Sequence, residues 1–189
     1  MRLFAALVPP DEILDEISRA IAPHVGQVPG LRWPDRATWH ITLGFFGEVP
    51  EQVLPELEER LARAVHRYSV LDLAFTGFGA FSSARRARVF WVGVTGDSMT
   101  RLADSVKAGA RRAGAVQTDE KRFHPHLTLA RAKTETDLRP LVESLSGFSG
   151  SPWRAQQVRL VRSHAGSLTG PQVRYESLAE WALAPSGQS

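Results

Sequence analysis

Two copies of the tetrapeptide His-x-Thr-Leu place an imidazole and a hydroxyl two residues apart at two points of the chain. The copies are His40 to Leu43 and His126 to Leu129, and each lies in an apolar stretch that is typical of a β-strand. Because successive side chains of a strand point to opposite faces, His and Thr at positions i and i+2 share one face, about 7 Å apart. The sequence therefore predicts two His/Thr pairs, each displayed on one face of a strand.

Two such pairs that face one another across a cleft could perform chemistry at phosphorus. The hydroxyls would hydrogen-bond to a phosphoryl group while one imidazole lies on each side of it. A neutral imidazole would take a proton from an attacking water, and a protonated one would give a proton to the departing alkoxide, with no metal required. Imidazole suits both tasks because its unperturbed pKa is about 6.5. At about 7 Å and an effective dielectric near 20, two imidazolium charges repel by about 2.4 kcal/mol, so the free site should favour one shared proton.

The two motif copies belong to a longer internal repeat. When the chain is compared with itself at the motif spacing of 86 residues, Arg2 to Val8 aligns with Arg88 to Val94 without a gap, and this ungapped alignment matches Phe4 with Phe90. Farther along, the match is of apolar pattern rather than of identity. Each half therefore predicts the order strand, helix, His-x-Thr strand, helix, strand.

We expect a single bilobal domain with repeats at about 1–76 and 87–163 and a C-terminal strand at 174–183. A loop rich in Gly, Ser and Arg, Gly77 to Arg86, is the expected lobe boundary. The other predicted elements are strands at 2–8, 38–46, 71–75, 89–94, 127–130 and 158–162 and helices at 12–21, 51–66, 100–113 and 137–145.

Composition narrows the class of protein only partly. The chain has 189 residues, no Cys and a net charge of +3, and 20 of its 23 basic residues are Arg. The absence of Cys excludes disulfides and thiolate metal sites. Arg clasps phosphate through two donors, which suits a phosphate-bearing partner, although coding bias could also enrich Arg. No signal peptide and no membrane span are visible, so we expect a cytoplasmic protein, with a monomer as the default state.

The motifs together resemble those of the two-histidine phosphoesterases. The N-terminal strand Arg2 to Leu7, the Gly44 to Gly47 segment after the first motif, and Phe123 to Arg131 are similar to the prokaryotic RNA 2′,3′-cyclic phosphodiesterases, also called 2′-5′ RNA ligases. The resemblance extends to Ser163 and to the region Gly170 to Tyr175. It therefore covers nearly the whole chain.

The resemblance implies a fold, an activity and roles for particular residues. The fold is α+β, with two pseudo-symmetric lobes, each a mainly antiparallel sheet with helices on its outer face, around a central cleft. The activity is cofactor-free, metal-independent opening of RNA 2′,3′-cyclic phosphate ends to 2′-phosphomonoesters, in some members with reversible 2′-5′ ligation. By position, His40 would be the proton donor and His126 the proton acceptor, while Thr42, Thr128 and Arg131 would bind the phosphate.

Simpler interpretations exist for each of these residues. A single His or Thr on a half-buried strand is most often structural, and only the duplication favours function. His124 and His126 have a spacing common in metal sites, but no Cys or clear local carboxylate accompanies them. Arg131 could pair with a surface acid. Phe4 and Phe90 could stack on RNA bases or belong to the core.

A non-catalytic function also stays open. Duplicated sheets that present arginines and aromatics could form an RNA-binding module with no hydrolytic activity. Such a module would bind ordinary 3′-hydroxyl RNA, whereas the enzyme would act on RNA ends or small nucleotides that carry a 2′,3′-cyclic phosphate. Turnover of a cyclic phosphate discriminates between the two.

Overall fold

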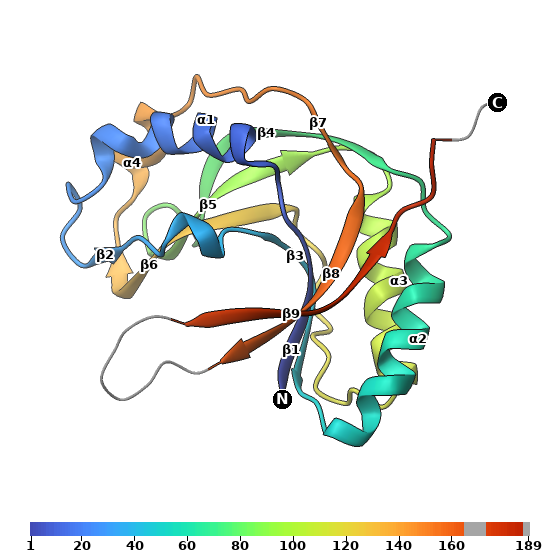
Figure 1. The fold of residues 1–189 in the computed structure, drawn as a ribbon. Coiled ribbons are helices and arrows are strands. Elements are labelled where there is room, and N and C mark those ends of the chain that lie inside the picture. The colour runs from blue at the N-terminus through green and yellow to red at the C-terminus, as the bar shows by residue number, and fades with distance from the viewer. Residues whose placement is uncertain (165–172, 187–189) are drawn as a thin grey trace.

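The computed structural model describes residues 1–164 and 173–186, which form one curved antiparallel sheet with helices packed on it (Figure 1). The strands are β1 (Arg2–Leu7), β2 (Leu31–Arg32), β3 (Ile41–Glu48), β4 (Leu71–Ser82), β5 (Ala87–Thr95), β6 (His126–Thr136), β7 (Trp153–Ala155), β8 (Gln157–His164) and β9 (Arg174–Ala182). The helices are α1 (Asp11–Ile21), α2 (Leu54–Val65), α3 (Met99–Arg112) and α4 (Arg139–Ser144), and short 3-10 turns cover 22–24, 36–38 and 51–53. The predicted α+β class is confirmed.

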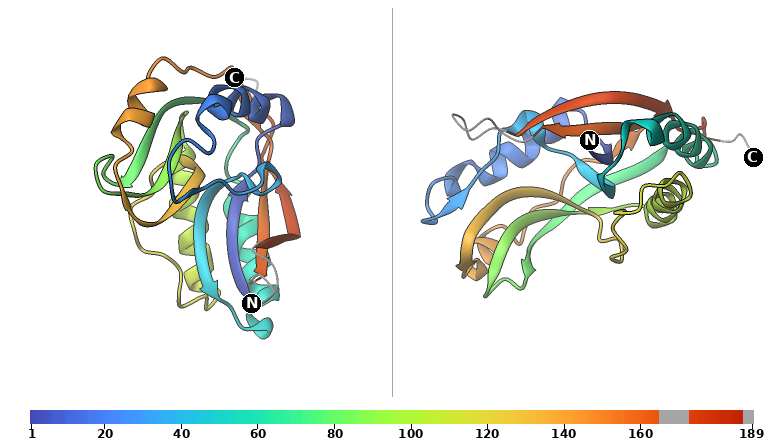
Figure 2. Two further views of the ribbon diagram at one scale, coloured as in Figure 1. Left: turned by 90° about the vertical axis from the view of Figure 1, so that its left-hand side faces the viewer. Right: turned by 90° about the horizontal axis from the view of Figure 1, so that it is seen from below.

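The main path of the sheet runs in the order β7-β4-β5-β6-β3-β1-β8-β9, with β2 added beside β6. Seen from below, β8 and β9 lie in one curved layer and β5 and β6 in another (Figure 2). The two layers are joined where β3 pairs with β6, at the buried pair Ile41 and Leu127. Helices α2 and α3 lie side by side at one end of the molecule, and α1 and α4 lie toward the other (Figure 1).

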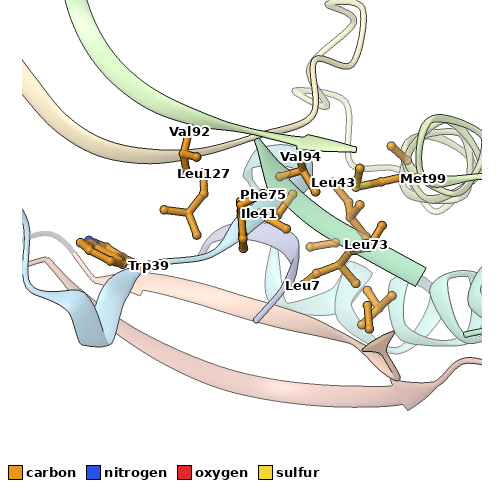
Figure 3. Packing of buried hydrophobic residues seen from close by; sticks show 14 of the residues in the cluster. Leu7, Trp39, Ile41, Leu43, Leu73, Phe75, Val92, Val94, Met99 and Leu127 are labelled. Atoms are coloured by element: carbon orange, nitrogen blue, oxygen red, sulfur yellow. The ribbon is translucent and has the colours of Figure 1, made fainter. Parts of the chain in front are cut away.

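Apolar periodicity explains why these segments become helices and strands. In α1, which follows Pro9 and Pro10, the buried residues are Ile13, Leu14, Ile17 and Ile21, as the spacing predicts. In β1, Leu3, Ala5 and Leu7 face the main hydrophobic core, whereas Phe4 and Ala6 face the other side. Figure 3 shows that Val92 and Leu127 of the β5–β6 layer point toward Ile41 and Phe75 inside the main core. The helices cover one face of the sheet, and the opposite face is free for a site.

The segment Gly77 to Arg86, predicted as a loop, is largely strand. Strand β4 continues through Ser82 and pairs with β5, and only residues 83–86 connect the two. The prediction was wrong because it took the glycines of this segment as signs of a loop. Gly79 instead lies inside the strand, where a Cβ would be 2.4 Å from indole carbons of Trp91. A glycine in a strand commonly marks such a close approach.

The two layers do not coincide with the two halves of the sequence. Strand β4 of the first half pairs with β5 and β7 of the second half, and β8 of the second half pairs with β1 of the first. Each half thus contributes its last strand to the layer built by the other half. Within residues 1–164 and 173–186, no helix is both long enough and apolar enough to cross a bilayer.

Candidate active site

A pocket of about 590 Å³ opens on the face of the sheet opposite the main core. Its floor comes from the middle strands, and its lining includes His40, Thr42, His126, Thr128 and Arg131. These five predicted catalytic and phosphate-binding residues therefore line a single cavity, and the stacking candidate Phe4 lines it as well. Its other lining residues are Arg2, Pro34, Asp35, Ala37, Thr38, Phe45, Ser163, Val173 and Tyr175.

The pairing of β3 with β6 explains why the motif residues meet. Ile41 lies opposite Leu127, and both side chains are fully buried in the core. In an antiparallel ladder the flanking positions point to the other face, so His40 lies across from Thr128 and Thr42 lies across from His126. The two His therefore occupy diagonal corners, a relation that separates residues by about 7–8 Å.

Both catalytic candidates are held by the same local hydrogen bond. Nδ1 of His40 donates to the carbonyl oxygen of Thr38 at 2.7 Å, and Nδ1 of His126 donates to that of His124 at 2.6 Å. A carbonyl only accepts, so Nδ1 carries hydrogen in both rings. The Nε2 atom of each ring is then the one that gains or loses a proton, which is the condition for acid or base catalysis.

The surroundings lower the pKa of both imidazoles. Burial is the largest cause of the lowered pKa of His40; the charges of Arg131 and His126 lower it further, and the hydrogen bond to Thr38 opposes them. Burial also dominates the lowered pKa of His126, with the charges of His124 and Arg131 in the same direction. In the free enzyme these effects favour the neutral form of both rings, which differs from the single shared proton expected from charge repulsion alone, because that expectation left out burial. A bound phosphate anion would act in the opposite direction, because a nearby negative charge favours the protonated form.

Aromatic rings surround the first histidine. Phe4 stacks on His40 with ring centroids 4.7 Å apart, and Tyr175 meets the same ring edge-on at 5.3 Å. Burial raises the pKa of Tyr175, so its hydroxyl keeps its proton at neutral pH. Tyr175 lies at the end of the region Gly170 to Tyr175 that the resemblance included; positions 165–172 lie outside the described residues.

The candidate stacking residue Phe90 does not face the pocket. It is fully buried in the main core, whereas Phe4, 3% exposed, belongs to a small cluster beneath the pocket. The pairing of the strands shows that the ungapped alignment of the halves is wrong at this point. Phe4 pairs with Phe45, and the residue equivalent to Phe45 in the second half is Arg131, which pairs with Val89 and not with Phe90. Phe90 thus corresponds to Ala5, and a slip of one residue moves a side chain to the other face.

Arg131 is exposed at the edge of the pocket, and no carboxylate of the described residues forms an ion pair with it. The alternative that Arg131 pairs with an acidic residue on the surface is therefore not supported in the described residues. The residue at the equivalent position of the first half is Phe45, over which the guanidinium of Arg2 lies, 5.0 Å from the ring centroid. The sequence analysis did not identify Arg2 as a pocket residue. The available signal was its spacing: Arg2 lies two residues before Phe4 in the first strand, so the two side chains share one face.

Across residues 1–164 and 173–186, no group of three or more His, Asp or Glu side chains is arranged to hold a metal ion. The His124 and His126 rings are 5.9 Å apart, and Nδ1 of His126 is engaged by the His124 carbonyl.

Comparisons with known proteins show the family to which the chain is similar. A model of the 2′-5′ RNA ligase superfamily matches residues 9–167. An RNA 2′,3′-cyclic phosphodiesterase of Aeropyrum pernix is 36% identical over 152 residues, which cover 79% of this chain and 85% of that protein. The protein of the same name from Archaeoglobus fulgidus is 33% identical, covering 86% and 91%.

The fold is also similar to those of solved structures. The crystal structure of TT0787 of Thermus thermophilus superimposes with a TM-score of 0.80 at 27% identity, covering 99% of this chain and 100% of that one. Escherichia coli LigT complexed with 3′-AMP gives 0.74 at 28% identity, covering 96% and 97%. Fold and sequence thus define an enzyme of the two-histidine phosphoesterase class. The chain belongs to the 2′-5′ RNA ligase superfamily.

Proposed function

We propose that this enzyme hydrolyses the 2′,3′-cyclic phosphate at RNA ends to a 2′-phosphomonoester. The observation that carries the proposal is the matched anchoring of His40 and His126, whose Nδ1 atoms are both fixed to backbone carbonyls beside one pocket. Two Nε2 atoms are then available to a single phosphorus. The names of the relatives from Aeropyrum pernix and Archaeoglobus fulgidus support the same substrate.

In the proposed reaction, water attacks phosphorus opposite the 3′ oxygen of the ribose. Nε2 of His126 accepts a proton from the water as the new P–O bond forms, and protonated His40 gives its proton to the 3′ oxygen as the P–O3′ bond breaks. The product carries its phosphate on the 2′ oxygen. The near symmetry of the pocket does not distinguish the two roles, and the assignment of His40 as donor comes from its position in the family motif.

The remaining polar residues would stabilise charge on phosphorus. Thr42 and Thr128 lie on the pocket face beside the two imidazoles, where their hydroxyls can donate to the non-bridging oxygens. The exposed guanidinium of Arg131 can approach the same oxygens from the rim. The two hydroxyls would supply neutral hydrogen-bond donors, and Arg131 together with a protonated His40 would supply the positive charge that offsets the negative charge on the phosphoryl oxygens.

The same geometry accommodates 2′-5′ ligation. If the 5′ hydroxyl of a second RNA replaces water, His126 takes its proton, and the product is a 2′-5′ phosphodiester with a free 3′ hydroxyl. The reverse reaction uses the same two groups with their roles exchanged, as microscopic reversibility requires. Hydrolysis or ligation then depends on which nucleophile occupies the side of His126.

One incubation tests the proposed reaction against the non-catalytic RNA-binding module that the sequence alone left open. An oligonucleotide with a 2′,3′-cyclic phosphate is mixed with the protein in chelator, and the monoester formed is identified by its position on the ribose. We expect a 2′-phosphate. A 3′-phosphate would contradict the assigned polarity, and unchanged substrate combined with tight binding of 3′-hydroxyl RNA would support the binding module.

A further inference from the structure

A second group of aromatic side chains surrounds His126, outside the pocket lining. The ring of Phe81 meets the His126 ring edge-on at 5.0 Å, and Trp91 lies 6.2 Å from it. His124 closes the group, 4.9 Å from Trp91 and 5.2 Å from Phe81. We call Phe81, Trp91 and His124 the aromatic platform.

The platform continues the catalytic face of the sheet. Trp91 pairs with Thr128, and Phe81 pairs with Val89, which in turn lies opposite Arg131. Because cross-strand neighbours share a face, both aromatic rings belong to the face that carries Thr128 and Arg131. Phe81 and Trp91 are half-buried and His124 is exposed, so a ligand can reach the group.

Two further features fix the platform in place. Trp91 lies over Gly79, where any Cβ would collide with its six-membered ring. The rings of Phe81 and Trp91 contact each other at 5.3 Å, and Phe81 also contacts both His124 and His126. The residue equivalent to Trp91 in the first half is Ala6, so the large ring is a property of the His126 side alone.

Each imidazole thus has its own aromatic neighbours, and the two sets lie on different sides of the reaction. In the proposed mechanism the 3′ oxygen of the ribose that carries the cyclic phosphate leaves phosphorus toward His40, so this ribose lies on the side of Phe4 and Tyr175. The nucleophile approaches on the side of His126, and a water molecule needs no aromatic surface there. A nucleoside does, because bases bind by stacking on aromatic rings.

We infer that the aromatic platform is a second nucleoside subsite, which binds the base of a nucleotide whose 5′ oxygen occupies the place of the attacking water. The inference rests on the proposed function and on its assignment of His126 to the nucleophile side. The ligand that fills both sides at once is a 2′-5′-linked dinucleotide. In its cleavage, the 3′ hydroxyl gives its proton to His40 and attacks phosphorus, and the 5′ oxygen leaves with a proton from His126.

The test uses hydrolysis of a nucleoside 2′,3′-cyclic phosphate as the readout for two competitors. One competitor is a nucleoside 2′-monophosphate, which has one base, and the other is a 2′-5′-linked dinucleoside monophosphate, which has two. For Phe81→Leu, the inhibition constant of the dinucleotide should rise about tenfold more than that of the mononucleotide, the size expected for one lost base stack. Phe81→Trp, which restores a stacking surface, should recover the dinucleotide affinity.

A matched control is Trp181→Leu, which removes a ring from β9 at the position paired with Val158. It should change the two inhibition constants by the same factor. If Phe81→Leu also changes both equally, or if the wild-type protein does not bind the dinucleotide, the second subsite is refuted. If the wild-type protein fails to hydrolyse the cyclic phosphate at all, the proposed function itself fails, and this outcome is distinct from the others.

Discussion

At the scale of single residues, the site depends on two imidazoles that differ in task but share one local geometry. Each His precedes a buried apolar residue and a pocket-facing Thr, and each donates from Nδ1 to the carbonyl two residues earlier. This hydrogen bond fixes both the tautomer and the orientation of the ring, because a backbone carbonyl can only accept a hydrogen bond. The reactive Nε2 atoms are thus defined by backbone geometry.

Removal of either imidazole should therefore abolish turnover without unfolding the protein. We expect His40→Ala and His126→Ala each to lower kcat on a 2′,3′-cyclic phosphate by at least about a hundredfold, the usual contribution of a general acid or base. Both rings lie on the pocket side, so the main core stays intact and the thermal midpoint should stay within a few degrees. Steady-state kinetics and circular dichroism melting curves measure the two effects. Retention of near-wild-type kcat in either variant would contradict the mechanism.

The lowered pKa values of both His predict a difference between two pH profiles. The profile of kcat/KM reports the free enzyme, so its maximum should lie below the ordinary histidine value of about 6.5. Bound phosphate raises the pKa of both rings, so the maximum of kcat should lie at higher pH. Rates measured from pH 4.5 to 9 with saturating and limiting substrate separate the profiles. Identical maxima, or a flat kcat/KM profile where chemistry limits the rate, would argue against paired imidazoles.

The lowered pKa values of His40 and His126 also predict how the free energy of unfolding changes with pH. Since the folded pKa of His40 and His126 lies below the unfolded value, the unfolded chain binds more protons as pH falls below about 6.5, and stability is lost there. Above that pH the contribution is constant. The double variant His40→Gln/His126→Gln should therefore lose less unfolding free energy than wild type between pH 7.5 and 5. Urea titrations at the two pH values give this difference, and equal losses in both proteins would refute it.

At the scale of secondary structure, the site requires that β3 and β6 stay joined. The two strands pair at Ile41 and Leu127, directly beneath the four motif side chains. Each strand also has a β-bulge directly after its motif Thr. In β3 the bulge is at Leu43, where the strand pairs with β1, and in β6 it is at Leu129, where the strand pairs with β5. Such bulges bend a strand and re-aim its side chains. The contact between the two layers therefore sets the distance between the imidazoles.

Ile41→Ala tests this connection. Truncation of this fully buried side chain should cost about 2–5 kcal/mol of unfolding free energy. It should also lower kcat of the fully folded protein, because the cavity loosens the strand pair that positions the His rings. Leu61→Ala in α2 is the matched control: Leu61 is equally buried but lies in the helix layer, so stability should fall while kcat stays close to wild type. Equal kcat losses in both variants would exclude a positioning role for Ile41.

Sequence periodicity predicted most of these elements, the repeated motif predicted the four His and Thr residues of the pocket, and the family resemblance predicted Arg131. The sequence could not predict the faces of β4 and β5. The His and Thr of each motif are two residues apart within one strand, so their shared face follows from strand geometry alone. The faces of Phe81, Trp91 and Phe90 depend instead on bulges and on register between strands, which involve residues far apart in the sequence. This is why the repeat indicated Phe90 as a stacking candidate and gave no sign of the aromatic platform.

At the scale of the whole molecule, the internal repeat and the sheet layers follow different divisions of the chain. The expected repeats, 1–76 and 87–163, each supply one His/Thr pair, yet β4 and β8 cross to the layer of the opposite half. One continuous hydrophobic cluster contains residues from both halves, including Leu7, Phe75 and Leu129. Neither half can bury its apolar face alone, because the strand that completes its layer belongs to the other half.

The exchange of strands predicts how the chain responds when it is divided. Expressed separately, residues 1–84 and 85–189 should show no cooperative melting, since each fragment exposes part of the shared core. Mixed in equal amounts, they should associate, melt cooperatively and recover cyclic phosphate hydrolysis, because each fragment brings one imidazole to the pocket. A mixture in which the second fragment carries His126→Ala should fold but stay inactive, which separates assembly from catalysis. Cooperative melting of the isolated fragment 1–84 would show that the first half completes a core of its own, contrary to the pairing of β1 with β8 and of β4 with β5.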